Sequence, residues 1–551
     1  MFLNNVFKTR KINPRWIVCK PTIAEDGKMV MVETYSSVSG FGMFTNPLEF
    51  GEYMKSQSRR GVHVYLSNAS VSVRALFDVP DFEKNGWEYI RLLKSNFLFR
   101  FRKGQSYTIY VHDLKAYVEV PIDKMGIKDL ISLVSFLYEK FNQTGMLCVS
   151  TAQYAFREAR KTMDGRVEKH SCNICENSYF HGHTEALVRG NIKDIATLDM
   201  NSAYAWAATN PLPKRHLDTF EHSTIAEVNQ LVKSGFGVFA KCKVKVPGNV
   251  KIAPFPYRDQ VLGIIYPCGE FITFLSGIEI VKYSAYVEEI YATEVFSMSP
   301  YLRDFVLQAY TKRINCTDKI ERGFWKQVLV ATYGKFAEKP VSLIYEPRLD
   351  TVGSSIDSIE GELDGTVHKY QKWGVKWYRE EKAPHSVIFP AVSAMITAYL
   401  RIRMAELFER VSDVNVIYYD IDALSVYAKD LMKLGGYLGD AIGEFKIEYT
   451  GDINIFSTFA YMTAAKRKVP GLPLSVTPEV GDNTFTRFKG FGEGAKDKLE
   501  TVTKHFTISV SDFRRDWNEN DSLPLKIDQI NQSRLNYILE HNSLYRVAGG
   551  L

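Results

Sequence analysis

The chain has 551 residues, enough for three or four domains of about 100–200 residues each. With 45% hydrophobic and 13% aromatic residues it can bury several cores, which excludes a disordered, collagen-like or low-complexity protein. The net charge of +6 suits a protein that meets a polyanion over part of its surface. No apolar run reaches the ~20 residues of a membrane span, no secretory signal is apparent, and the seven scattered cysteines are typical of a reducing compartment. We therefore expect a soluble, cytoplasmic protein without a membrane partner.

Residues 1 to about 165 alternate strand-like runs with helical patterns, which predicts a mixed α/β domain. The helical pattern is clearest over Lys128–Phe141. The strand-like runs are Met29–Val32, His63–Leu66, Ser106–Val111 and Ala116–Val120. Phe97, Phe99 and Phe101 alternate with Leu98, Arg100 and Arg102. This alternation favours an ordinary half-buried strand over a platform on which single-stranded bases stack.

From residue 179 onward the sequence predicts an α+β region with several long helices. A turn-rich stretch, 179–183, leads into an apolar run, 195–198, that ends at Asp199. Helices are expected over Tyr301–Arg313, Asp318–Glu338 and about Phe389–Arg410, the second opened by an Asp318/Glu321 capping box and closed by Pro340. A hairpin is expected at Asp420-Ile421-Asp422.

Three aspartates could form a metal site. If VNVIYYDIDALSVY is a strand, Asp420 and Asp422 project from the same face, because strand side chains repeat every second residue. Two carboxylates so close repel each other unless a cation lies between them, and hard oxygen ligands favour Mg²⁺. Asp-x-Asp alone is common in exposed turns. Asp199, at the end of another apolar strand, would complete a site for two metal ions, which can drive a phosphoryl transfer.

The helix predicted over Asp318–Glu338 carries a complementary pair of residues. Lys326 and Tyr333 lie on one face, seven residues or roughly 10.5 Å apart. That is about the distance from the triphosphate to the base of a nucleotide. The alternative, a surface lysine and a core tyrosine, would be favoured for a helix considered alone.

Four stretches in order resemble the motifs of family B DNA polymerases, and within that family those of the protein-primed branch found in phages and linear plasmids. LDMNSAYAW is similar to the first palm motif, KQVLVATYGKFAEKP to the fingers motif, and IYYDIDALSVY to the second palm motif. YFHGHTEAL resembles the loop that joins the exonuclease and polymerase modules. The resemblance covers about residues 170–495.

The resemblance implies an α/β and α+β multidomain fold: an exonuclease-like (RNase H-like) N-terminal domain and a right-hand polymerase of palm, fingers and thumb with two terminal-protein-region insertions. The implied divisions are 1–165 for the exonuclease-like domain, 166–205 and 386–456 for the palm, 206–310 for the first insertion, 311–338 for the fingers, 339–385 for the second insertion and 457–551 for the thumb. The implied partners are template and primer DNA, dNTPs and a terminal (priming) protein.

The resemblance also implies roles for single residues. Asp199 and Asp422 would bind two Mg²⁺ ions directly, with Asp420 beside them. Lys326, aided by Lys312 or Arg313, would neutralise the triphosphate. Tyr204 would stack beneath the ribose and exclude a 2′-hydroxyl, and Tyr333 would close over the nascent base pair. Ser202 is a further nucleotide-binding candidate, and the DNA-binding candidates are Tyr179, Gly182, Tyr461, Lys489, Lys466 and Lys468.

The sequence departs from the family at several positions. Val330 and Ala331 replace the Asn and Ser of the fingers motif, and Phe459 occupies the lysine position of a Lys-x-Tyr motif that ends at Tyr461. Other replacements are Ala203, Ala205, Ile421 and Ala423. In the N-terminal domain the strand WIVCKPTI has no acidic residue, and Asn68 is followed by Ser70 and Ser72 instead of an aspartate. Asp113 and Asp129 could be remnants of later elements. We therefore expect a folded exonuclease-like domain without proofreading, because two metals cannot be held there without carboxylates.

His170, Cys172, Cys175, His181 and His183 contain a Cys-x-x-Cys with nearby histidines. Their spacing fits no standard zinc finger, so we expect no zinc. Two functional alternatives stay open: a polymerase that uses a nucleic-acid primer, and a non-catalytic scaffold that binds DNA or a terminal protein. The three aspartates together with Lys326 and Tyr333 disfavour the scaffold, which would need no such combination.

Overall fold

The computed structural model describes residues 2–3, 15–24, 28–67, 69–93, 98–118, 120, 122–163, 167–168, 170–338, 341–349, 358–363, 366–373, 376–382, 389–468, 479–481, 484–490, 503–509 and 512–537. Within these residues, no helix is both long and apolar enough to cross a bilayer.

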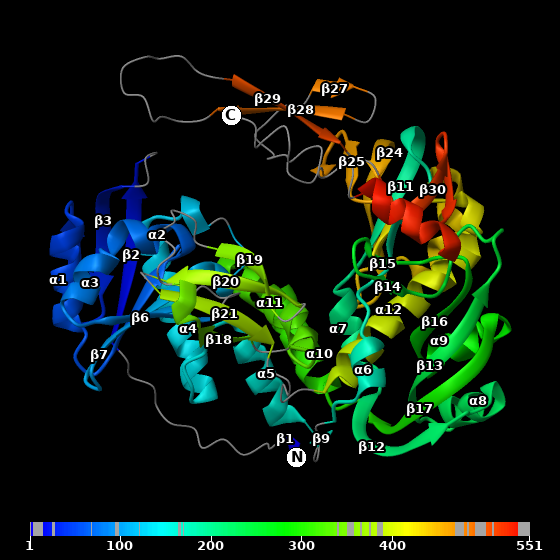
Figure 1. The fold of residues 1–551 in the computed structure, drawn as a ribbon, viewed down its shortest axis with the longest axis horizontal. Helices are drawn as coiled ribbons and strands as arrows, with labels where there is room; N and C mark the ends of the chain where they lie inside the picture. Colours follow the sequence, from blue (N-terminus) through cyan, green and yellow to red (C-terminus); the bar gives the residue numbers. More distant parts are fainter. Residues whose placement is uncertain are drawn as a thin grey trace.

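The N-terminal part is built on a seven-stranded mixed sheet with the order β4-β3-β2-β5-β8-β7-β6 (Figure 1). Strands β2, β5 and β8 run parallel, whereas the flanking strands are antiparallel. The bounds are β2 Arg15–Ile23, β3 Met29–Ser36, β4 Gly40–Phe44, β5 Val62–Leu66, β6 Glu88–Leu93, β7 Leu98–Lys103 and β8 Tyr107–Asp113. The expected mixed α/β domain is confirmed.

Helices cover this sheet. They are α1 Pro47–Gln57, α2 Ala69–Leu76, α3 Val79–Lys84, α4 Ile127–Thr144 and α5 Thr151–Thr162. The helix predicted over Lys128–Phe141 is thus found as α4. The strand predicted over Ala116–Val120 is wrong, because Leu114–Ala116 form a 3-10 turn capped by Asp113. Phe99 and Phe101 are buried in the core of β7, as expected for an ordinary strand; Phe97 lies outside the described residues.

A second seven-stranded sheet has the order β10-β22-β23-β11-β24-β25-β26. It combines β10 Thr184–Ala186 and β11 Gly190–Met200 with strands from more than 200 residues further along the chain. Those strands are β22 Val416–Asp420, β23 Ala423–Tyr427, β24 Phe445–Ser457, β25 Ala460–Thr463 and β26 Arg467–Lys468. Helices α7 Ala203–Ala208 and α12 Pro390–Val411 pack against each other beside it.

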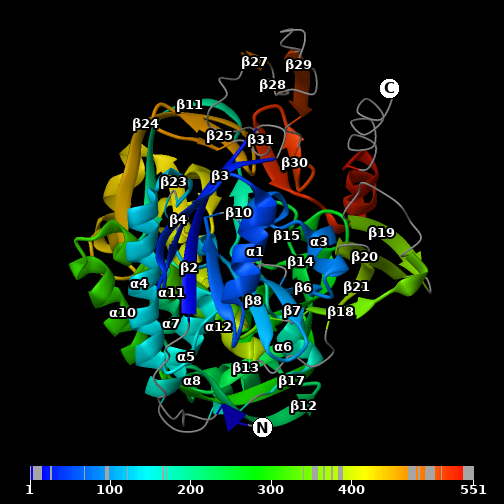
Figure 2. The same cartoon turned by 90° about the vertical axis from the view of Figure 1, so that its left-hand side faces the viewer.

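The chain between α7 and α10 forms a four-stranded antiparallel sheet, β12-β17-β13-β16. Its elements are β12 Leu212–Glu221, α8 Ile225–Lys233, β13 Gly237–Val246, β14 Tyr257–Asp259, β15 Gly263–Ile265, β16 Gly269–Ser276, α9 Gly277–Lys282 and β17 Val287–Ser299. Short elements precede it: β1 Phe2–Leu3 pairs with β9 Val167–Glu168, and α6 Asn173–Asn177 packs against β13, β17 and α12. Figure 2 shows β12, β13 and β17 at the bottom of the molecule, next to α6 and α8.

Helices α10 Arg303–Asn315 and α11 Lys319–Gly334 pack side by side and against α5. Asp318 caps α11 by accepting the Glu321 N–H at 2.8 Å, as the sequence predicts. The helix ends at Gly334, four residues before the predicted end at Glu338, and Pro340 lies outside the described residues. Phe324 of α11 meets Phe136 and Tyr154 edge to face, which joins α11 to the helices of the N-terminal domain.

A second small sheet has the order β18-β21-β20-β19, with bounds Val341–Tyr345, Lys376–Lys382, Thr366–Trp373 and Ser358–Leu363. Tyr378 of β21 packs against the core of the N-terminal sheet. The C-terminal part contains a three-stranded sheet, β27 Glu479–Gly481, β28 Thr484–Gly490 and β29 Thr503–Ser509, and a hairpin, β30 Arg515–Asn518 and β31 Asp521–Pro524. The largest core joins side chains of the N-terminal helices, α10, α11, α12 and the second seven-stranded sheet.

Candidate active site

The three aspartates lie at neighbouring ends of adjacent strands in the second seven-stranded sheet. Asp199 is near the end of β11 and pairs with Ala423, the first residue of β23. Asp420 ends β22, and Asp422 lies in the two-residue turn between β22 and β23. The Met200 N–H donates to the Asp422 carbonyl at 3.0 Å. The fold thus brings together residues separated by more than 200 positions in the sequence.

The strand geometry expected for the Asp-x-Asp pair is wrong at Asp422. The strand stops at Asp420, and Ile421 has a φ of +60°, so the chain turns back before Asp422. Val414, at the other end of the expected strand, lies in a 3-10 turn. The two aspartates therefore approach each other through a tight turn and not through the two-residue repeat of a strand.

The electrostatics of the three carboxylates differ. Burial, followed by the nearby charges of Asp199 and Asp420, raises the pKa of Asp422 to about 7. Asp199 forms an ion pair with Lys446 at 3.4 Å. Asp420 accepts a hydrogen bond from the Thr184 hydroxyl at 2.9 Å and forms an ion pair with Lys468. Asp422 is thus the carboxylate whose charge is least compensated by these contacts.

This donor set fits divalent magnesium. Its ligands would be hard carboxylate oxygens, and a cation between Asp199 and Asp422 would relieve the repulsion that raises the pKa of Asp422. The two carboxylates line the same two neighbouring cavities, whereas Asp420 lines only the one on the side of Tyr461 and Lys466. The expected order, in which Asp199 and Asp422 are the direct ligands and Asp420 lies beside them, stays a prediction.

A cleft of about 660 Å³ extends from Asp199 and Asp422 to α11. Lys326 and Arg313 line it, and the Arg313 guanidinium donates to the Ser202 hydroxyl at 2.6 Å. Ser202 begins α7 with a φ of +54°. Lys312, the alternative to Arg313, is not a cleft residue: its ammonium lies 4.6 Å from the centre of the Trp325 ring. The helical period explains this difference, because consecutive residues of α10 point about 100° apart.

Tyr204 lines the cleft, and Tyr333 packs against the Tyr204 ring. The rings of Tyr204 and Tyr333 stack with centroids 4.1 Å apart and an angle of 3° between their planes. Tyr204 comes from α7 and Tyr333 from the last turn of α11. The roles expected for the two rings at the sugar and the base of one nucleotide stay predictions.

Sequence reasoning missed several residues that line the same cleft. Arg322 lies one turn before Lys326 on α11 and adds a positive charge, and Tyr310 comes from α10. Lys446 and Glu448 come from β24, which is paired with β11. The four-residue spacing of Arg322 and Lys326 was a usable signal for the arginine. Lys446 could not be assigned, because its position depends on the pairing of two strands that are far apart in the sequence.

The loop from Tyr179 to His183 holds the Asp420–Asp422 turn in place. The Ile421 N–H donates to the His183 carbonyl at 2.9 Å. A Cβ added at Gly182 would lie 2.5 Å from the Ile421 side chain, so only glycine fits there. The Tyr179 carbonyl accepts from Arg258 at 2.9 Å. The candidates Tyr179 and Gly182 thus contact residues that shape the site.

A buried charge network lies behind this loop. The Tyr419 hydroxyl contacts His183 at 2.9 Å and Glu185 at 2.6 Å, and Arg515 pairs with Glu185 at 2.6 Å. Arg401 of α12 pairs with Glu279 at 2.7 Å and donates to the Phe180 carbonyl at 3.1 Å. Both ion pairs are almost fully buried, and paired partners are what make buried charges tolerable.

The remaining DNA-binding candidates lie beyond the aspartates. Tyr461 and Lys466 line the second cavity together with Lys468, and Lys466 lies 3.7 Å from Glu448. Phe459, at the position where the family has lysine, contacts Arg514, whose guanidinium lies 4.6 Å from its ring. Lys489 is in β28, and its side chain lies outside the described residues.

The N-terminal sheet lacks carboxylates on β2. Asp113 instead accepts the N–H groups of Ala69 at 3.0 Å and Lys115 at 2.9 Å, and Asp129 accepts the Gly126 N–H at 3.0 Å. Both aspartates therefore cap helical turns. Ser72 is buried in α2, and Asn68 lies outside the described residues.

Residues 127–346 match the family model of DNA polymerase type B, organellar and viral. Among solved structures, phi29 DNA polymerase with primer-template DNA and incoming nucleotides matches with a TM-score of 0.62 and 12% identity, over 94% of this chain and 100% of that one. The phi29 polymerase with primer-template DNA alone matches with a TM-score of 0.59 and 12% identity, over 90% and 92% of the two chains. At this identity the likeness shows the fold. No curated protein matches the sequence.

Proposed function

We propose that this chain is a DNA polymerase of the organellar and viral B type, because residues 127–346 match that family model and the fold is similar to that of phi29 DNA polymerase. It would replicate a linear genome and begin each strand on a protein primer. The first nucleotide would be joined to a side-chain hydroxyl of a separate terminal protein. Two four-stranded sheets that are separate from the sheet of the aspartates support this proposal. One is β12-β17-β13-β16, which follows α7, and the other is β18-β21-β20-β19, which follows α11. They occur where the resemblance implies the two terminal-protein-region insertions.

In the proposed reaction a dNTP occupies the cleft between the aspartates and α11. Lys326, Arg313 and Arg322 bring three positive charges to this cleft, where they would bind the triphosphate and neutralise the pyrophosphate as it leaves. Tyr204 and Tyr333 would position the sugar and the base. With Ser202, Arg313 also fixes the start of α7, so phosphate binding and the position of Tyr204 are coupled.

Asp199 and Asp422 would hold two Mg²⁺ ions, which lower the pKa of the attacking hydroxyl and stabilise the charge that develops at the α-phosphate. Asp422 must lose its proton to act as a ligand. Lys446 and Lys468 pair with Asp199 and Asp420, and Lys446 partly offsets the burial that raises the pKa of Asp199.

The observation that carries the proposal is the convergence of Asp199, Asp422, Lys326 and Arg313 on one cleft. The test is incubation of the purified chain with Mg²⁺, a labelled dNTP and a candidate terminal protein. Transfer of label to that protein is expected, and it should be lost with Asp422→Asn and kept with Asp528→Asn, which changes an exposed aspartate. Extension of DNA primers without any transfer to protein would refute protein priming while leaving the polymerase assignment intact.

A nucleic-acid primer is the second candidate, because the phi29 polymerase of similar fold was solved with primer-template DNA. Extension of an annealed primer is compatible with both proposals, since a protein-primed enzyme must also elongate. We further propose that the enzyme does not proofread, which is supported by the absence of acidic residues on β2. The seven free cysteines among the described residues support work in a reducing cytoplasm.

A further inference from the structure

A second group of chemically reactive side chains lies where α6 meets the β12-β17-β13-β16 sheet, and none of its members lines the cleft of the aspartates. One ligand atom each of His170, Cys172 and Glu294 lies within 4.8 Å of the other two. His170 and Cys172 directly precede α6, and Glu294 is in the middle of β17. Cys172 and Cys175 are both free thiols. Such a set of nitrogen, sulfur and carboxylate donors is characteristic of zinc sites.

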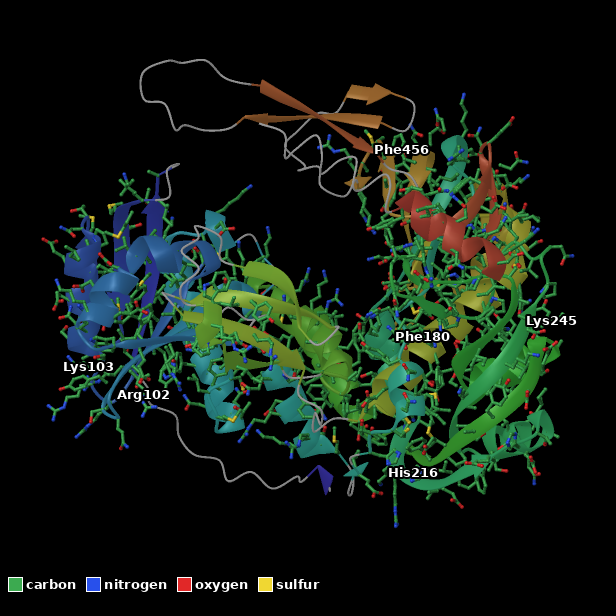
Figure 3. All side chains as sticks on the ribbon, viewed as in Figure 1. Arg102, Lys103, Phe180, His216, Lys245 and Phe456 are labelled. Atoms are coloured by element: carbon green, nitrogen blue, oxygen red, sulfur yellow. The ribbon has the colours of Figure 1, made fainter. Side chains whose placement is uncertain are left out.

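Neighbouring groups orient these donors. The His216 ring from β12 stacks on the His170 ring, with centroids 4.1 Å apart and planes at 3°. His216 Nε2 lies 2.6 Å from the Glu294 carboxylate, and the Thr219 hydroxyl donates to the same carboxylate at 3.2 Å. His170 Nε2 is buried without a hydrogen-bond partner, 3.5 Å from the Glu294 carboxylate. Figure 3 labels His216, at the lower end of the molecule.

The backbone of the Cys-x-x-Cys turn favours a thiolate at Cys172. The Cys175 N–H donates to Cys172 Sγ at 3.2 Å. An N–H group directed at this sulfur favours the thiolate, which is the form of cysteine that binds a metal ion.

We propose that His170, Cys172, Cys175 and Glu294 bind one Zn²⁺ ion. His216 and Thr219 would orient the Glu294 carboxylate through their contacts with it. Sulfur and imidazole donors select zinc over the magnesium that the aspartates would bind. The ion would link the segment before α6 to strand β17 in the β12-β17-β13-β16 sheet. The expectation of no zinc rested on spacing within one segment, which cannot reveal Glu294 and His216 on distant strands.

The site is independent of polymerase activity and is tested by metal content. The chain is purified without chelators, dialysed and analysed by elemental mass spectrometry, with about one zinc per chain expected. Cys172→Ser and Glu294→Gln should lose the metal. Cys316→Ser, which changes a cysteine of similar partial exposure after α10, should keep it. His216→Gln should weaken zinc binding by about 10–100-fold, as expected for a residue that orients a ligand.

Cobalt provides a second measurement that does not depend on yield. Co²⁺ added to the metal-free wild type should give a thiolate charge-transfer band in the near ultraviolet, and Cys175→Ser should roughly halve it. Circular dichroism of each variant shows whether it is folded. A folded wild type that takes up no zinc and shows no such cobalt band would overturn the proposal, as would binding that survives Cys172→Ser.

Discussion

The raised pKa of Asp422 links its burial to both catalysis and stability. A carboxyl group whose pKa is raised to about 7 binds its proton more tightly in the folded than in the unfolded chain. The folded chain therefore loses stability as the pH rises from the unfolded pKa of about 3.9 to about 7, and the full cost is present above that. The same ionised group is the one that metal binding requires.

Asp422→Asn should remove this loss of folding stability, and it should also abolish polymerase activity. Primer extension is expected to fall by about a thousandfold or more, since a metal ligand supplies several kcal/mol of transition-state stabilisation. Without divalent ions the variant should melt at a higher temperature than wild type at pH 8 and at the same temperature near pH 4. Thermal melts at both pH values, compared with Asp528→Asn, check this. A lower melting temperature at pH 8 would contradict the assigned burial.

Tyr204 should control the choice of sugar. Tyr204→Ala removes the ring that stacks on Tyr333, and discrimination against ribonucleotides is expected to fall by about 10–100-fold, or about 1–3 kcal/mol. The measurement is the ratio of kcat/KM for dNTP and rNTP in primer extension. Tyr333→Phe, which keeps the ring, is the control and should leave the ratio unchanged. An unchanged ratio in Tyr204→Ala would place the sugar elsewhere.

At the scale of elements, helix α12 is the support on which the site depends. It packs against α7, α6, α9 and α11, and its buried Arg401 joins Glu279 of α9 to the carbonyl of Phe180. The loop beginning at Phe180 then contacts the turn between β22 and β23. Arg401 thus joins α9 to the loop whose His183 carbonyl accepts a hydrogen bond from the turn.

Arg401→Met should leave Glu279 buried and without its partner, which costs about 3–5 kcal/mol of unfolding free energy. Arg410→Met changes an exposed arginine in the last turn of the same helix and should cost less than about 0.5 kcal/mol. Chemical denaturation of both variants gives the comparison. Equal stabilities would show that the buried pair contributes nothing to the position of α12.

At the scale of the whole molecule, the N-terminal domain keeps its fold and its contacts without the acidic residues of a nuclease. Its helices α4 and α5 contact α11 through Phe136, Tyr154 and Phe324, and β21 reaches its core through Tyr378. Removing the domain would expose part of the core that supports α11. These contacts are a structural reason to retain the domain, whether or not it hydrolyses DNA.

A primer with a mismatched 3′ end should therefore be extended or stalled but never shortened. The measurement is gel analysis of an end-labelled primer with Mg²⁺ and without dNTPs. Asp113→Asn should change stability, since Asp113 caps two helical segments, and should leave this result unaffected. Trimming that disappears in Asp422→Asn would arise at the polymerase site, whereas trimming that persists in that variant would refute the silent domain.

Local patterns were sufficient for much of the fold. The capped start of α11, the extent of α4 and α12 and the hairpin at Asp420-Ile421-Asp422 follow from periodicity, capping residues and turn residues close together in the sequence. Failures occurred where local signals were ambiguous: the run at Ala116–Val120 is a capped turn, and the strand expected through Asp422 stops at Asp420.

The sequence by itself determined which reactive side chains are present. They are three aspartates in apolar surroundings and a lysine and a tyrosine on one helix face, and an N-terminal strand has no acidic residue. Only the tertiary structure decided which residues meet. Pairing of β24 with β11 brings Lys446 to Asp199. Packing of β17 against α6 brings Glu294 to Cys172, and pairing of β12 with β17 brings His216 to Glu294. The physical reason is that strand register and helix docking are set by burial of apolar faces from distant segments, which no local pattern encodes.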